Sequence, residues 1–139
     1  MKMQQTLKPV TTTLLVALIA LTVACGYSAK MSAPVAGTVP TIATLNPGSA
    51  TAGAPAFTLT VNGATFGTKA TVNWNGAAQT ANTTFVSASQ LTVAVPASAI
   101  STSGTITVTV TNPGTPGTGI YGTGATMPET STPMDFTVN

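Results

Sequence analysis

The chain has 139 residues, of which 43% are hydrophobic and only 4% are charged. This length is typical of one domain with an additional segment. The charged side chains are Lys2, Lys8, Lys30, Lys69, Glu129 and Asp135. Nucleic-acid binding needs several basic side chains to neutralise phosphates, so the sparse charge excludes nucleic acid as a partner class.

Residues 1–24 have the three-part layout of a secretory signal peptide. Lys2 and Lys8 give a positive start, and a short apolar run follows over residues 14–23. The small residue Ala24 then precedes Cys25. This ending resembles the lipoprotein signal of bacteria, although Thr22 stands where that signal usually has an aliphatic residue.

The resemblance implies that Cys25 is the site of lipid attachment. Its thiol would take a diacylglyceryl group carrying chains such as palmitate, and cleavage after Ala24 would free its amine. Two or three acyl chains make a stable membrane anchor where one chain is marginal. The expected location is the cell envelope, and Gly26 after the cysteine favours the outer membrane in a cell with two membranes.

Two other interpretations of the leader stay open. In one, Cys25 is an inert residue of an ordinary signal peptide that is cleaved elsewhere. In the other, the uncharged run over residues 9–29 stays as an uncleaved signal anchor. Because Cys25 is the single cysteine, it cannot form a disulfide within the chain, and lipidation explains it best.

Residues 25–39, starting at the lipidated cysteine, are rich in small residues and contain Pro and Gly, so we expect a flexible linker there. A folded domain is expected over residues 40–139. Alternating apolar and polar residues predict short strands throughout it. The predicted strands are Thr41–Leu45, Phe57–Asn62, Ala70–Asn75, Ala77–Thr80, Thr84–Val86, Gln90–Val95, Gly104–Thr111 and a last strand over 134–138.

The expected fold is an all-β, immunoglobulin-like antiparallel β-sandwich of about seven strands, preceded by the N-terminal apolar signal segment. Asn75-Gly76 predicts a type I′ hairpin turn, because both residue types tolerate positive φ. A turn-rich connection is expected over residues 49–55, and one short helical turn over 96–100. Core packing is the expected role of the larger aromatic residues Phe57, Phe66, Trp74 and Phe136.

An ordered set of motifs resembles the IPT/TIG domain, an immunoglobulin-like family found in plexins, transcription factors and bacterial surface proteins. The motifs are P-x-I-x-x-L-x-P over 40–47, L-T-V-x-G-x-x-F over 59–66, V-x-W-N-G over 72–76, L-T-V-x-V-P over 91–96, G-T-I-T-V-T-V-T-N-P over 104–113 and a terminal F-T-V. In a bacterial protein, the resemblance implies an extracellular module for adhesion, for spacing or for assisting a catalytic partner.

The chain departs from the family pattern in a long loop over residues 114–133, where relatives usually have a short connection. Such loops are usually functional or disordered. Ile120 and Tyr121 are its bulky apolar pair and the candidate ligand contacts. One interpretation is a recognition loop centred on Tyr121, and the other is a solvated, flexible insertion with Tyr121 packed against the edge of the sheet.

No catalytic site is expected. There is no histidine, and the two carboxylates Glu129 and Asp135 are not placed as a pair, so neither an enzyme nor a metal or cofactor site is predicted. We therefore expect a non-catalytic, lipid-anchored module that contacts an envelope protein or polysaccharide. The alternative function is a carbohydrate-binding surface module that uses the loop over 114–133.

Overall fold

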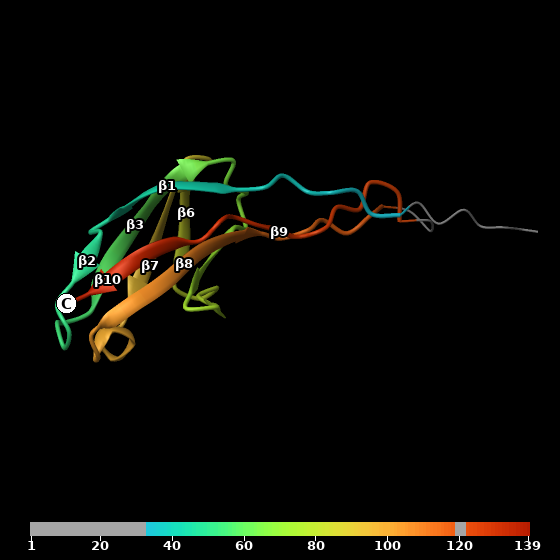
Figure 1. Cartoon of the computed structure of the whole chain (residues 1–139). Helices are drawn as coiled ribbons and strands as arrows, with labels where there is room; N and C mark the ends of the chain where they lie inside the picture. Colours follow the sequence, from blue (N-terminus) through green and yellow to red (C-terminus); the bar gives the residue numbers. More distant parts are fainter. Residues whose placement is uncertain (1–32, 119–121) are drawn as a thin grey trace, which may run out of the picture. The chain divides into compact units, whose positions relative to one another are not determined.

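Two β-sheets pack face to face in the computed structural model, which describes residues 33–118 and 122–139 (Figure 1). The first sheet has four antiparallel strands. Their spatial order is β1 (Thr41–Asn46), β3 (Phe57–Ala64), β7 (Gln90–Val95) and β6 (Thr83–Ser87). This is the A-B-E-D order of the first sheet of an immunoglobulin domain.

The second sheet has six strands built around β8. Five strands follow one another as β2 (Ser49–Ala50), β10 (Met134–Val138), β8 (Gly104–Asn112), β4 (Thr71–Trp74) and β5 (Ala77–Ala78). The short strand β9 (Glu129–Thr130) also pairs with β8. All strand pairs of the second sheet are antiparallel except the pair of β2 with β10, which is parallel. The predicted immunoglobulin-like sandwich is confirmed.

The core lies between the inward faces of the two sheets, as the alternation of apolar residues predicts. The side chains below 2% exposure include Leu59, Val61, Val72, Leu91, Val93, Val108, Val110 and Phe136. The Phe136 ring stacks on Phe57 with 5.8 Å between centroids and lies against Trp74 at 5.1 Å. Phe66 is 3% exposed. The core role expected of these aromatic residues is therefore confirmed, with Phe57 partly buried at the edge of the cluster.

Local turn chemistry is also confirmed. Asn75 and Gly76 have φ of 49° and 80°, and they connect Trp74 to its partner Ala77. A 3-10 helical turn over Ala97–Ile100 follows Pro96 and places Ile100 in the core. The connection after β1 differs from the expectation, since it contains β2, whose Ser49 and Ala50 pair with Thr137 and Val138. A two-residue strand carries no periodicity, so only its partner reveals it.

Candidate functional site

The segment that follows β8 is a hairpin whose limbs are joined by hydrogen bonds. The Thr126 amide donates to the Thr115 carbonyl at 3.0 Å, and the Thr115 amide donates to Thr126 Oγ1 at 2.9 Å. Farther out, Thr118 and Thr123 exchange two backbone hydrogen bonds of 2.9 and 3.1 Å. We call this hairpin, residues 114–118 and 122–128, the arm.

Glycine is needed where the limbs of the arm meet. A Cβ atom on Gly114 would meet the carbonyl oxygen of Thr126, and one on Gly117 would meet the carbonyl of Gly122. The limbs approach too closely for any side chain at these two positions. The glycine-rich composition, which predicts an irregular loop, thus permits a paired structure here.

The chain preceding β1 lies along the return limb of the arm. The Val35 amide donates to the Ala125 carbonyl at 3.0 Å, and the Met127 amide donates to the Val35 carbonyl at 2.9 Å. Figure 1 shows this segment side by side with the arm. We call residues 33–39 the docked segment. They form the last part of the region expected to be a linker, and the boundaries of that linker stay a prediction.

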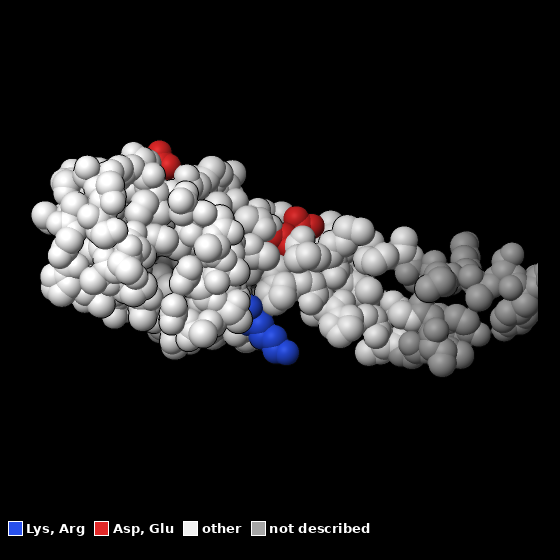
Figure 2. Space-filling model, turned by 90° about the horizontal axis from the view of Figure 1, so that it is seen from below, with Lys and Arg blue, Asp and Glu red and all other residues white. Residues whose placement is uncertain are grey.

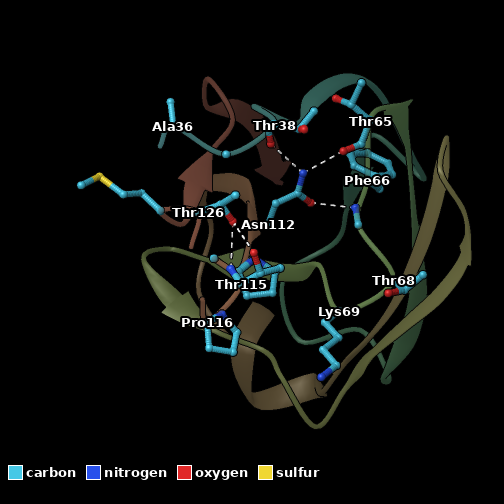
Figure 3. Close-up of a pocket in the computed structure, with 15 residues that line it drawn as sticks. Ala36, Thr38, Thr65, Phe66, Thr68, Lys69, Asn112, Thr115, Pro116 and Thr126 are labelled. Atoms are coloured by element: carbon cyan, nitrogen blue, oxygen red, sulfur yellow. Dashed lines mark hydrogen bonds between the residues drawn. The ribbon is translucent and has the colours of Figure 1, made fainter. Parts of the chain in front are cut away.

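Asn112, the last residue of β8, leads into the arm and ties the docked segment to the sandwich. Its Nδ2 atom donates to the carbonyls of Thr38 and Thr65, each at 2.8 Å (Figure 3). Its Oδ1 atom accepts a 2.8 Å hydrogen bond from the Gly67 amide. The side chain is 8% exposed. One buried amide therefore holds three segments that lie far apart in the sequence.

A cleft of about 670 Å³ opens where the arm meets the sandwich (Figure 3). We call it the junction cleft. Its apolar lining comes from Ala36, Phe66, Pro113, Pro116 and Met127. Its polar lining comes from Lys69, Asn112 and the threonines Thr38, Thr65, Thr68, Thr115 and Thr126. This volume and a mostly apolar lining with a few polar groups are typical of ligand sites.

Lys69 gives the junction cleft its positive charge. It is exposed, and it is the one basic residue within residues 33–118 and 122–139. Figure 2 shows the basic group projecting from the surface near the base of the arm, apart from both acidic groups in that view. The cleft therefore combines one cation with apolar and hydroxyl-bearing walls.

Residues 40–128 match the family model of the IPT/TIG domain. The chain belongs to the IPT/TIG family. This confirms the family expected from the ordered motifs. Comparisons with curated proteins and with solved structures gave no match. The match ends at residue 128, the last residue of the arm. The strand β10 lies beyond the matched residues, yet it supplies the core residues Phe136 and Val138.

The structure describes some of the predicted site residues and not others. Cys25, Ile120 and Tyr121 lie outside the described residues, so lipid attachment and ligand contact stay predictions. The carboxylates lie on separate strands, Glu129 on β9 and Asp135 on β10. Within the described part of the chain, no group of three or more His, Cys, Asp or Glu side chains is arranged to hold a metal ion. Over the same residues, no helix has the length and apolarity needed to cross the bilayer.

Sequence reasoning missed Asn112 and Lys69 as residues of a site. For Asn112 a signal was present, because the period-2 pattern of β8 puts residues 108, 110 and 112 on the same inward face. A buried amide must find hydrogen-bond partners. No local pattern marks Lys69, since the cleft beside it is formed by segments from three parts of the chain.

Proposed function

We propose that this chain is a non-catalytic bacterial lipoprotein whose IPT/TIG domain binds another protein of the cell envelope. The leader ending in Ala24-Cys25 supports the anchor, because lipidation gives the single cysteine a role. Family membership supports a structural or interaction module, since IPT/TIG domains are generally non-catalytic. The described carboxylates on β9 and β10 are not paired as a hydrolase would need them.

The observation that carries the interaction role is the arm with its apolar surface. Val35 is 60% exposed, Val39 is 51% exposed and Met127 is 50% exposed, and all three lie on the arm or the docked segment. Exposed apolar side chains on an ordered element offer contact points for a partner, because their burial on binding is favourable. Because the backbone is already ordered, less conformational entropy is lost on binding.

The arm also has the connectivity of a known recognition loop. It connects β8 to β9 and β10, which corresponds to the F–G connection of an immunoglobulin domain. Antibody variable domains use that connection as one of their binding loops. The carbohydrate alternative has less support, because the described aromatic rings pack in or against the core rather than facing outward.

The test compares the full chain with a variant in which residues 113–128 are replaced by an Asn-Gly turn. Asn112 and Glu129 are cross-strand partners, so a two-residue turn can connect them. Both proteins, purified from membranes, are exposed to fractionated envelope proteins and polysaccharides. We expect the full chain to retain a protein fraction that the variant loses.

A matched control is Val86→Ser, which removes an exposed valine on β6, outside the arm and the docked segment. Retention should survive this change. Equal retention by the full chain and the arm-replaced variant would contradict the arm as the contact surface. Retention of polysaccharide in place of protein would favour the carbohydrate alternative.

A further inference from the structure

The junction cleft has walls from three parts of the chain, which contact with a protein surface does not require. It lies between the docked segment, the turn carrying Thr68 and Lys69, and the outgoing limb of the arm. Asn112 holds the docked segment and the turn together through its bonds to Thr38, Thr65 and Gly67. The outgoing limb of the arm is held by the hydrogen bonds between Thr115 and Thr126. The cleft is therefore formed before any ligand arrives, as is usual for small-ligand sites.

The charge of the cleft selects a ligand that bears one negative charge. Lys69 lines the opening, and the carboxylates of Glu129 and Asp135 are not among the lining groups. A lysine ammonium acts as a point charge and pairs with a single anionic group such as a carboxylate.

The walls of the cleft select for an apolar group next to that charge. Met127, Pro113 and Pro116 are among the residues that line the cleft, and Met127 is 50% exposed. A methionine side chain adapts its shape to apolar partners. The one aromatic ring in the lining, Phe66, is 3% exposed and offers little face for stacking of a sugar ring.

We propose that the junction cleft binds the free carboxyl terminus of a peptide chain whose last residue is apolar. Lys69 pairs with the terminal carboxylate, and the last side chain packs against Met127 and the two prolines. Thr38 and Thr68 line the same cleft, and a threonine hydroxyl can bond to a peptide backbone. Capture of a terminal carboxylate is a recurring mode of peptide recognition. This inference rests on the proposed function and specifies its partner.

The test uses the full chain in lipid nanodiscs and measures binding of a labelled acetylated tetrapeptide, Gly-Ser-Ala-Leu, as the free acid. We expect the carboxamide form to bind about fivefold more weakly, the size typical of an exposed ion pair. A peptide ending in serine should also bind more weakly than the one ending in leucine. Empty nanodiscs correct for partition of the peptides into lipid.

Variants at Lys69 assign the charge effect to the cleft. Lys69→Gln should lower affinity for the free acid to that for the carboxamide, whereas Lys69→Arg should keep the difference. Lys69 is exposed, so neither change should disturb the fold, and circular dichroism checks this. Absence of peptide binding, equal binding of acid and carboxamide, or an unchanged preference in Lys69→Gln would overturn the proposal.

A second probe separates the peptide from an acidic polysaccharide. Binding of an oligoglucuronate that depends on Lys69, without binding of the peptide, would assign the cleft to acidic glycans and overturn the peptide proposal. If no peptide binds but the arm still retains an envelope protein, the proposed function stands and this inference alone fails.

Discussion

Asn112 is the residue that holds the docked segment against the end of the sandwich. Its side chain satisfies two carbonyl groups and one amide, those of Thr38, Thr65 and Gly67. The bond to Thr38 spans 74 positions in the sequence. A buried polar group left without a partner is costly, so these bonds stabilise mainly by avoiding that cost.

Replacement of Asn112 by alanine tests this role. Three partly buried backbone groups would lose their partners, and we expect the free energy of unfolding to fall by about 2–3 kcal/mol. Denaturant titration of the full chain measures it. The matched control is Asn62→Ala, because the Asn62 side chain bonds only to the side chains of Thr44 and Gln90 and holds no backbone group. Similar losses from both variants would contradict a special role for Asn112.

At the scale of the elements, the arm shows how composition and structure diverge. Glycine and proline are usually read as loop signals. In the arm, Gly114 and Gly117 are instead required by close backbone contacts between paired limbs. Gly37 has the same role in the docked segment, where a Cβ atom would meet the carbonyl oxygen of Met127.

Gly114→Ala should therefore loosen the arm without unfolding the sandwich. The added methyl group meets backbone atoms, and overpacking of this kind typically costs about 1–3 kcal/mol. We expect faster hydrogen exchange at the Val35, Thr126 and Met127 amides, which bond across the arm and the docked segment. Amides of the core strands should keep their protection.

The control for this experiment is Gly48→Ala. A Cβ atom on Gly48 would meet only the Leu45 carbonyl oxygen at 3.7 Å, an ordinary contact. Exchange in the arm should be unchanged in this variant. Unchanged exchange in Gly114→Ala as well would show that the limbs of the arm are not held as closely as described.

At the scale of the whole molecule, β8 separates the arm from the carboxyl end of the domain. Gly104, at one end of β8, pairs with Val138, while Asn112 at the other end leads into the arm. The docked segment lies beside the arm and leads into β1. A lipid on Cys25 would thus be connected to the sandwich through the docked segment at the arm end of β8.

Cys25→Ala tests the proposed anchor in living cells. We expect loss of incorporated palmitate and no cleavage after residue 24, measured by radiolabelling and by mass spectrometry of the full chain. The sandwich should still fold, because its described residues contain no cysteine. Thr22→Leu is the control, since it brings the leader closer to the usual lipoprotein signal and should preserve processing. Palmitate incorporation in Cys25→Ala would contradict the assignment.

The sequence by itself determined the strands of the sandwich other than β2 and β9, the Asn75-Gly76 turn and the family. These features follow from local rules, since inward residues recur with period 2 and a type I′ turn needs two residues that accept positive φ. The core alternation of Phe57, Leu59 and Val61 is an example, with Leu59 and Val61 fully buried.

Only the tertiary structure decided the parts of the candidate site. The pairing of Val35 with Thr126, the bonds of Asn112 and the cleft beside Lys69 bring together segments from separate parts of the chain. The strand β2 is another case, because it is defined by its partner β10. Such contacts depend on where the whole fold brings the backbone, and no local period or turn preference encodes that.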